Sequence, residues 1–296
     1  TGGEPLLRPD FREVWRFARQ QGLIPVLFTN GALLDEAMAD FLAEWTPRLV
    51  SITLYGASEE TYQRVSGYAG MHHRVLHALD LLRSRGVLTD VRSLITRRTV
   101  HEFDALREQA LSYQDVFRWD AELLAPYHDG GGDPHQERLS ADELLAVELR
   151  DEVRVAEWRE IAARWQPARP RPDTPFRCRV GVQDFHLDPY GAMLPCLGLE
   201  AVRLSLLEMS LAEAWETLPA AIAAAIGPPG PCQECPLPPI CRQCPADNLL
   251  AGEPTGWPVE WRCELAQLRA RVLGVPGVAP ALSVGARGTL GMPIPS

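Results

Sequence analysis

The chain has 296 residues, of which 46% are hydrophobic, and a formal net charge of −10 at pH 7. This length suffices for one large domain or two smaller ones, and the negative charge argues against nucleic acid or an anionic membrane as a partner. No apolar run approaches the roughly 18 residues of a membrane span. No secretory signal is recognisable either, so we expect a cytoplasmic protein that does not bind membranes.

The first 165 residues alternate between strand-like and helix-like patterns. Short apolar runs predict strands over residues 23–31, 48–56, 87–96 and 117–125. Helical spacing of apolar residues predicts helices over residues 10–21, 33–45, 74–86, 100–113 and 141–164. A further helix is expected to start at Ser58, an N-cap residue that two glutamates follow. Strands that alternate with helices of about 10–15 residues indicate βαβ units and a parallel sheet.

The pattern changes after residue 165. A proline-rich linker occupies residues 166–177, and the segment 178–275 contains short strands, turns and Pro–Cys pairs. Within this segment, FHLDPYGAMLPC predicts a hairpin that turns at Asp188–Gly191. Residues 276–296 have the composition of a disordered tail. The sequence therefore predicts two domains, over residues 1–165 and 178–275.

All the cysteines lie in the second half of the chain: Cys178, Cys196, Cys232, Cys235, Cys241, Cys244 and Cys263. An odd number leaves one cysteine over in a set of disulfides, and such crowding in a large acidic chain favours metal ligation. The two CxxC pairs can each present both sulfurs to one side. Seven thiolates do not divide into closed zinc sites of about four ligands each, whereas an iron–sulfur cluster tolerates an open iron. A non-catalytic binding or scaffold protein that cysteine-bound zinc stabilises remains the alternative.

The order of these cysteines resembles that of the SPASM domain of radical S-adenosylmethionine (SAM) peptide maturases. Twelve residues separate Cys178 from Gly191, AMLP leads to Cys196, and CQECPLPPICRQC is followed by Cys263. The usual pattern has three residues before the sixth cysteine, and this chain has only Arg242 and Gln243. The resemblance implies two auxiliary 4Fe–4S clusters.

Sequence spacing alone does not decide how the cysteines divide between these clusters. Cys232, Cys235 and Cys241 can bind one cluster together, and either Cys244 or Cys263 can be its fourth ligand. The resemblance favours Cys263. It implies a closed cluster held by Cys232, Cys235, Cys241 and Cys263, and an open cluster held by Cys178, Cys196 and Cys244.

The first half of the chain resembles the radical SAM barrel independently. TGGEPLL is similar to the end of its second strand, FTNG (28–31) to the end of its third, VSITLYGASEETYQRVSG (50–67) to its fourth strand and helix, and FRWDAELLAP (117–126) to its sixth strand. The resemblance implies an α/β fold, a partial (β/α)6 TIM-like barrel that lacks its first strands, followed by a small irregular SPASM domain.

The same resemblance implies that SAM binds at the carboxyl ends of these strands. Gly2 and Gly3 lack a Cβ and let the backbone approach the SAM ammonium closely, Glu4 adds a carboxylate, and Pro5 fixes the exit of the turn. An ordinary Gly-Gly turn is the alternative explanation of this segment.

Three further residues are predicted to line the SAM pocket. Ser51 and Thr53 share one face of a strand, because side chains alternate along it. Thr53 is the stronger candidate for contact with the ribose or carboxylate of SAM, and Asn30 is expected to close the pocket wall. The alternative for Ser51 and Thr53 is a solvated edge strand, and the alternative for Asn30 is an ordinary turn residue.

The resemblance also implies the reaction. The CxxxCxxC loop that holds the radical-generating 4Fe–4S cluster is expected before Thr1. An electron donor such as flavodoxin or ferredoxin is expected to reduce this cluster, which then cleaves SAM. The resulting 5′-deoxyadenosyl radical takes hydrogen from a peptide or protein substrate. An anaerobic sulfatase maturase is disfavoured, because Leu197 stands where such enzymes place an acid. A maturase of ribosomally made peptides fits better, and no residue is assigned as its acid or base.

Overall fold

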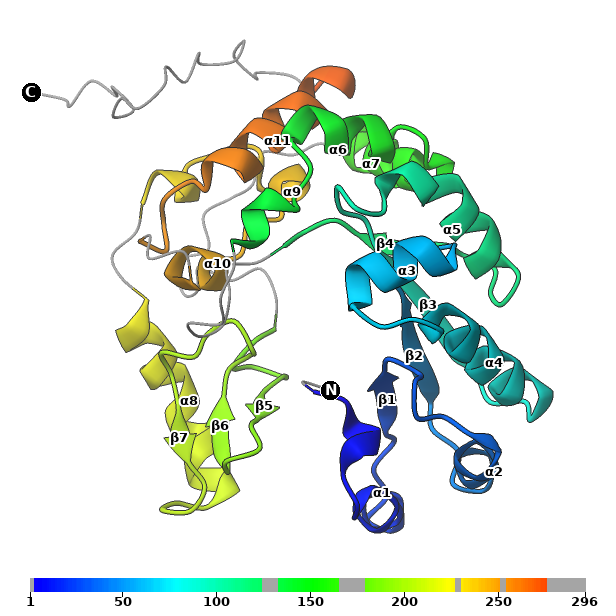
Figure 1. Ribbon diagram of the computed structural model, residues 1–296. Helices are drawn as coiled ribbons and strands as arrows, with labels where there is room; N and C mark the ends of the chain where they lie inside the picture. Colours follow the sequence, from blue (N-terminus) through cyan, green and yellow to red (C-terminus); the bar gives the residue numbers. More distant parts are fainter. Residues whose placement is uncertain (1–2, 124–132, 165–178, 227–229, 251–253, 276–296) are drawn as a thin grey trace, which may run out of the picture. The chain divides into compact units, whose positions relative to one another are not determined.

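The structure is a computed structural model of the chain, and it describes residues 3–123, 133–164, 179–226, 230–250 and 254–275 (Figure 1). The chain divides into two compact units. The first is Thr1–Leu123 with Gln136–Leu139, and the second is Leu124–His135 with Ser140–Ser296. This division differs from the predicted boundary, since residues 140–164 belong to the second unit. The predicted linker, 166–177, and the predicted tail, 276–296, lie outside the described residues.

The first unit is built on a sheet of four parallel strands in the order β1-β2-β3-β4. The strands are β1 (Val26–Thr29), β2 (Leu49–Leu54), β3 (Thr89–Leu94) and β4 (Arg118–Asp120). The helices between and before them are η1 (Pro5–Leu7), α1 (Phe11–Gln20), α2 (Glu36–Glu44), α3 (Glu59–Ser66), α4 (Met71–Ser84), η2 (Val100–Glu102) and α5 (Phe103–Leu111). The predicted alternation and the parallel sheet are confirmed.

The two faces of this sheet differ in chemistry. On one face Leu27, Ile52 and Val91 are buried against the helices that Figure 1 shows beside the sheet. The opposite face carries polar residues such as Ser51 and Asp90 beside the apolar Phe28, because side chains alternate along each strand. Strands of parallel sheets are normally apolar on both faces, so the polar face indicates a functional surface.

The cap of α3 follows the prediction. The Ser58 side chain accepts a hydrogen bond from the backbone N–H of Thr61 at 3.2 Å, and the acidic Glu59 and Glu60 occupy the first turn of the helix. The helix ends at Gly67, whose φ of 81° lies in the left-handed region. The Ser58 cap therefore fixes the residue at which α3 begins after the loop that follows β2.

The single long helix predicted over residues 141–164 is wrong. Two helices occupy this stretch, α6 (Ala141–Glu148) and α7 (Glu152–Ala163). The break occurs because the Asp151 carboxylate accepts from the backbone N–H groups of Val153 and Arg154, and so starts a new helix. A carboxylate that caps a helix cannot be distinguished by periodicity from one on a helix surface.

The second unit has short strands, several helices and two small cores. A three-stranded antiparallel sheet contains β5 (His186–Leu187), β6 (Ala192–Leu194) and β7 (Leu204–Ser205). The predicted hairpin turn is confirmed, since Asp188 Oδ1 accepts from the N–H groups of Tyr190 and Ala192, and Gly191 has a φ of 84°. The other elements are α8 (Leu211–Ala225), η4 (Pro231–Gln233), α9 (Pro238–Cys241), α10 (Pro245–Leu250) and α11 (Glu260–Val272).

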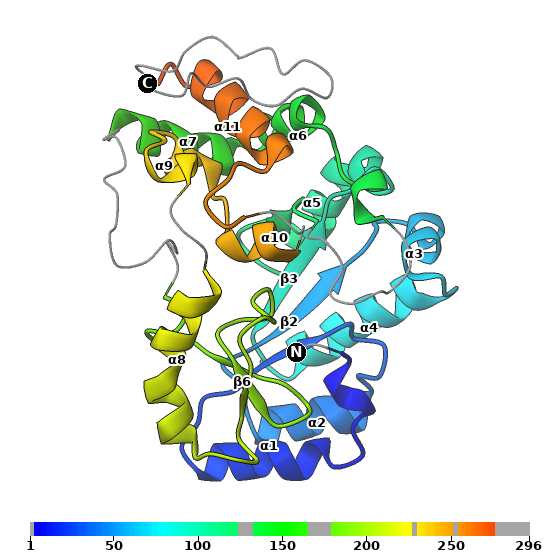
Figure 2. The same cartoon turned by 90° about the vertical axis from the view of Figure 1, so that its left-hand side faces the viewer.

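These elements pack in two groups. Met193 of β6 and Leu218 of α8 belong to one buried cluster, and Trp158 of α7, Ile240 of α9 and Ala266 of α11 belong to the other. Figures 1 and 2 both show α6, α7, α9 and α11 side by side. Among the described helices, none is both long and apolar enough to cross a membrane.

Candidate functional site

The Glu4 carboxylate joins the N-terminal segment to the end of β1. Its Oε1 accepts from the Leu6 N–H at 3.1 Å and from the Thr29 hydroxyl at 2.7 Å, and its Oε2 accepts from the Asn30 N–H at 2.7 Å. Thr29 Oγ1 in turn accepts from the Gly31 N–H at 3.1 Å. Two segments that the sequence predicted for the SAM site, GGEP and TNG, thus meet through one side chain. The Glu4 carboxylate thus holds the N-terminal segment against the carboxyl end of β1.

The neighbours of Glu4 leave room beside it. A Cβ added at Gly3 would meet nothing within 4 Å, so the backbone there is open to close approach. Pro5 is half-buried and begins η1, while Asn30 is exposed and its Oδ1 accepts from the Ala32 N–H at 2.9 Å. Gly2 lies outside the described residues.

The two residues predicted on the next strand differ in exposure. Ser51 is buried, and its hydroxyl donates to Asp90 Oδ2 at 3.3 Å. Thr53 is half-buried on the same face, pairs with Arg92 of β3, and its carbonyl accepts from the Tyr62 hydroxyl at 3.2 Å. Thr53 is therefore the more accessible of the two residues, whereas the Ser51 hydroxyl is used in the hydrogen bond to Asp90.

Sequence reasoning missed a charged group on this face. Asp90 lies next to Ser51. Its Oδ2 accepts a hydrogen bond from Arg92 Nε at 2.6 Å, and its Oδ1 lies 2.9 Å from Arg118 Nε in an ion pair without a hydrogen bond. The Arg92 guanidinium carbon also lies 5.7 Å from the centroid of the Phe28 ring. A signal was present in the sequence, because charged residues at alternate positions of a buried strand need partners.

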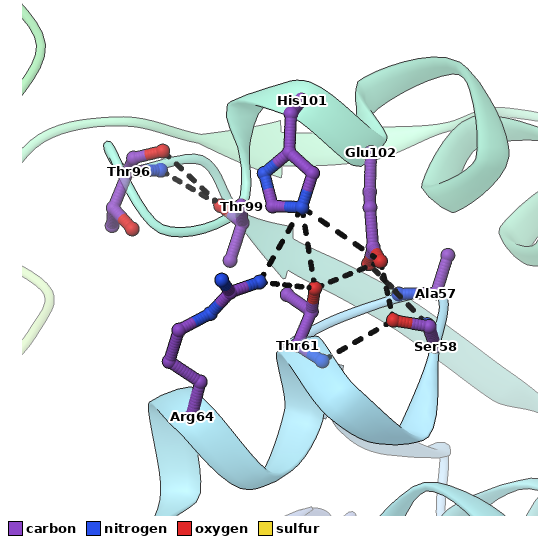
Figure 3. Close-up of polar contacts among 8 residues, drawn as sticks. All are labelled: Ala57, Ser58, Thr61, Arg64, Thr96, Thr99, His101 and Glu102. Carbon is purple, nitrogen blue, oxygen red and sulfur yellow. Dashed lines mark hydrogen bonds and ion pairs between the residues drawn. The ribbon is translucent and has the colours of Figure 1, made fainter.

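A second polar cluster connects the loop after β2 to the loop after β3 (Figure 3). The Glu102 carboxylate accepts from the Ala57 N–H at 2.7 Å, from the Ser58 N–H and hydroxyl, and from the Thr61 hydroxyl at 2.8 Å. Burial raises the pKa of Glu102, but these hydrogen bonds outweigh it and leave the pKa below its ordinary value. The charged form of Glu102 is thus the one that holds the two loops together.

Two basic side chains complete this cluster. Arg64 donates through Nη2 to Thr61 Oγ1 at 2.9 Å, and the His101 Nε2 atom lies 3.3 Å from the same oxygen (Figure 3). Thr99 fixes the preceding loop, since its hydroxyl donates to the Leu94 carbonyl and accepts from the Thr96 N–H, both at 2.9 Å. These loops follow the carboxyl ends of β2 and β3, the edge at which parallel α/β sheets bind ligands.

Six cysteines lie within the described residues, all of them half-buried and none in a disulfide: Cys196, Cys232, Cys235, Cys241, Cys244 and Cys263. Cys178 lies outside the described residues. In the described part of the chain, no three Cys, His, Asp or Glu side chains are arranged to hold one metal ion.

Four of these thiols interact with one another. Burial raises the pKa of the Cys232 thiol to about 12, and the nearby Cys241, Cys235 and Cys263 raise it further. Burial also raises the pKa of Cys241 to about 11, and Cys263 and Cys235 contribute again. Each of these thiols therefore lies within electrostatic range of the others, although no three of them are arranged to hold one metal ion in the part of the chain that the structure describes. Their donor set, four free thiols in a half-buried setting, fits an iron–sulfur cluster.

The other two thiols form a separate group. Burial raises the pKa of Cys244, with further contributions from Asp247 and from Cys196. Cys196 and Cys244 also pack against the same buried cluster, which contains Ala246 and Met193. Cys244 therefore has Cys196 as a neighbour, although it is only three residues from Cys241.

The two residues between Cys241 and Cys244 form an unusual turn. Arg242 has a φ of 55°, the left-handed region that non-glycine residues rarely adopt. Its guanidinium carbon lies 4.8 Å from the centroid of the Trp158 ring. The following Gln243 donates to Asn248 Oδ1 at 2.8 Å and to the Trp257 carbonyl at 2.6 Å. Side-chain contacts thus hold a strained turn that separates the two cysteine groups.

Comparison with known proteins places the first unit in a family. Residues 1–110 match the family model described as Radical SAM superfamily. These residues form a radical SAM domain. The chain is 31% identical to the AdoMet-dependent heme synthase of Methanosarcina barkeri (strain Fusaro / DSM 804) over 146 residues, which are 48% of this chain and 40% of that protein.

A second relative matches both units. The PqqA peptide cyclase of Xanthomonas euvesicatoria pv. vesicatoria (strain 85-10) is 29% identical over 293 residues, covering 92% of this chain and 75% of the cyclase. Among solved structures, Streptococcus suis SuiB bound to S-adenosylmethionine has a TM-score of 0.64 at 15% identity, covering 88% of this chain and 64% of SuiB. The chain thus spans less than half of the heme synthase and about three quarters of the cyclase. The likeness to SuiB shows a shared fold.

Proposed function

We propose that this chain is part of a radical SAM maturase that modifies a peptide or a protein. The observation that carries the proposal is the likeness to a peptide cyclase over 92% of the chain, which includes the cysteine-rich unit as well as the radical SAM domain. The likeness to the heme synthase, in contrast, covers only 48% of the chain. The fold also resembles that of SuiB. The TM-score between this chain and SuiB in its complex with the precursor peptide SuiA is 0.66.

SAM is proposed to bind at the carboxyl ends of β1 and β2. Gly3 offers an open backbone for close approach, and Glu4 holds Asn30 and Thr29 as one wall of the site. Thr53 supplies a half-buried hydroxyl on the neighbouring strand. Gly2, Pro5 and Ser51 complete the proposed set. SAM supplies, when bound and reductively cleaved, the group that takes hydrogen from the substrate, and these residues orient it.

The second unit is proposed to hold two auxiliary 4Fe–4S clusters. The grouping of four thiols supports a closed cluster on Cys232, Cys235, Cys241 and Cys263. The proximity of Cys196 and Cys244 supports a second cluster that Cys178 would complete. With three protein ligands, the second cluster would have one iron open to a substrate group or to solvent.

The remaining parts of the proposal follow from this chemistry. A radical-generating 4Fe–4S cluster is proposed for the enzyme, with flavodoxin or ferredoxin as its electron donor, and the enzyme would be an oxidoreductase. A cytoplasmic location suits the chain, because a reducing compartment keeps cysteines free to bind clusters. No residue is assigned as the catalytic acid or base.

Metal and sulfide analysis of the anaerobically purified protein tests the proposal. The cysteines of this chain are expected to hold roughly eight iron ions and a matching amount of acid-labile sulfide, as two 4Fe–4S clusters require. Stoichiometric zinc without sulfide would support the rival class, a zinc-stabilised scaffold protein.

A further inference from the structure

The open face of the sheet carries two arginines that share one carboxylate. Asp90 of β3 has only 8% of its side chain exposed; its Oδ2 accepts a hydrogen bond from Arg92 Nε, and its Oδ1 forms an ion pair with Arg118 Nε without a hydrogen bond. Ser51 of β2 supports the same carboxylate with its hydroxyl. A buried aspartate on the central part of the sheet therefore holds two positive groups side by side.

The outer ends of both guanidiniums remain available. Arg92 and Arg118 keep 50% and 60% of their side chains exposed. Within the described residues, neither Arg92 nor Arg118 has a hydrogen-bond or ion-pair partner for its Nη atoms. The fork of an arginine matches a carboxylate with two parallel hydrogen bonds, so two neighbouring forks form a receptor for that group.

The charges at this place come from both strands. Asp90 neutralises one of the two arginines. Asp120 of β4 lies on the same face as Arg118 and keeps its own negative charge, while its Oδ1 accepts from the N–H groups of Ala121 and Glu122. A ligand carboxylate would therefore be bound by the unused Nη groups of the two arginines and not by an excess of positive charge.

An apolar surface borders the two arginines. Phe28 and Val26 lie on the same face of β1 and are 39% and 37% exposed. The Arg92 guanidinium is positioned over the Phe28 ring, which limits its freedom to turn away. The surface thus combines a carboxylate receptor with an adjoining apolar contact, which suits an acidic residue within a peptide.

We propose that Arg92 and Arg118 bind an acidic side chain of the peptide substrate. This inference rests on the proposed function and narrows its substrate class to peptides with a glutamate or aspartate near the modified residue. Asp90 and Ser51 are positioning residues, because they act through the arginines.

A titration followed by NMR tests this proposal in the complete enzyme. The protein is labelled with 15N-arginine, and the Nε–H signals of Arg92 and Arg118 are assigned from the variants Arg92→Gln and Arg118→Gln. The probes are N-acetyl-Ala-Glu-Ala-amide, the matching Ala-Gln-Ala peptide, and SAM. We expect saturable shifts of both signals with the glutamate peptide, and binding of the glutamine peptide about tenfold weaker.

A matched control is available in the same unit. Arg83 also pairs with an aspartate, Asp80, at 2.7 Å and lies over a ring, that of Tyr113, at 4.9 Å, but on helix α4. Arg83→Gln should leave the peptide affinity unchanged. If Arg92→Gln fails to fold, the Arg118→Gln variant still assigns one of the two signals, and the comparison of the two peptides is then read from that signal in the parent enzyme.

Two results would overturn the proposal. Equal binding of both peptides, or no shift with either, removes the carboxylate receptor. Shifts caused by SAM alone would give the site to the carboxylate of SAM instead of the peptide. None of these readouts needs turnover, so they are distinct from a failure of the proposed function, which metal and sulfide analysis reveals.

Discussion

The two units of this chain are stabilised in different ways. The first is built on a parallel sheet, and its core consists of apolar side chains such as Ile52, Val91 and Leu106. The second has strands of only two or three residues, and charged groups lie among its buried residues, including Glu148, Arg262 and Arg269. The comparison teaches that the first unit depends on regular burial, whereas the second depends on specific polar contacts and, in our proposal, on bound clusters.

A buried polar contact of the second unit connects three helices. Arg269 of α11 donates to Glu148 of α6 through Nε at 2.8 Å and Nη2 at 2.6 Å, and through Nη1 to the Ile240 carbonyl of α9 at 2.8 Å. The side chains of Glu148 and Arg269 are only 1% and 5% exposed. The guanidinium also lies 4.7 Å from the Trp158 ring centroid. This contact fixes the residue directly before Cys241.

The largest effect is expected from removing cluster ligands. Cys263→Ala should damage the closed cluster and spare the open one, so that the iron content falls by up to roughly four ions. Cys244→Ala should instead damage the cluster of Cys196. Iron analysis and electron paramagnetic resonance of the reduced variants check this. If Cys244→Ala damages the cluster of Cys232 and Cys235, the proposed division is wrong.

The buried ion pair offers the next test, because it belongs to the second unit alone. Glu148→Ala should lower the free energy of unfolding of that unit by about 3–5 kcal/mol, since it leaves Arg269 charged and buried. Hydrogen exchange, read separately for each unit, should show faster exchange in the second unit only. Glu160→Ala, which breaks an exposed pair with Arg164 on α7, serves as the control and should change little. Unchanged exchange in the second unit would contradict this account.

Glu4 tests the SAM site of the first unit. Glu4→Ala removes the carboxylate that is proposed to lie beside the SAM ammonium, and a charge-assisted bond is worth roughly 1.5–3 kcal/mol, so SAM affinity should fall on the order of tenfold to a hundredfold. The iron bound by cysteines should not change. Calorimetric titration of the complete enzyme with SAM measures the effect.

A second variant distinguishes bracing from direct contact. Thr29→Val removes one partner of Glu4 and should reproduce part of the loss if the carboxylate acts as a brace. The exposed Glu13 of α1 provides the control, and Glu13→Gln should bind SAM as the parent enzyme does. SAM affinity that survives Glu4→Ala would remove this residue from the site.

The smallest effect concerns the pH dependence of the Glu102 cluster. Because the folded-state pKa of Glu102 is lowered, its stabilising effect is present above the unfolded pKa of about 4.3 and is lost as the pH falls through the folded value. Glu102→Gln should therefore destabilise the first unit by roughly 1–3 kcal/mol at neutral pH, and the difference should shrink below about pH 4.

Urea unfolding at neutral and acidic pH measures this difference. Glu108→Gln, at an exposed position of the neighbouring α5, should stay within about 0.5 kcal/mol at both pH values. A gap between Glu102→Gln and the parent protein that does not change with pH would show that the charge of Glu102 is unimportant.

Sequence reasoning recovered features that depend on local residues. The strands, the Ser58 cap and the turn at Asp188–Gly191 follow from periodicity and turn chemistry, and the structure confirms them. The break between α6 and α7 escaped, because Asp151 is equally compatible with a helix surface. Sequence spacing could identify the cysteines as a group, but only the resemblance suggested their division.

Contacts between distant residues could not be predicted. Glu148 and Arg269 are 121 residues apart, and Ser51 and Asp90 are 39 apart, so no local pattern joins them. The same holds for Glu4, which the sequence placed beside SAM but could not join to Thr29, 25 residues away. The polar face of the sheet became visible only when the register of β2, β3 and β4 was known.

A hydrogen-transfer measurement tests most directly whether this enzyme modifies a peptide by radical SAM chemistry. The complete enzyme, with SAM and a reductant, is incubated with deuterated peptides encoded beside its gene, and 5′-deoxyadenosine is analysed by mass spectrometry. The account predicts that one of these peptides transfers deuterium to 5′-deoxyadenosine and is itself modified. Formation of 5′-deoxyadenosine without deuterium from any peptide, while a non-peptide substrate is consumed, would contradict it.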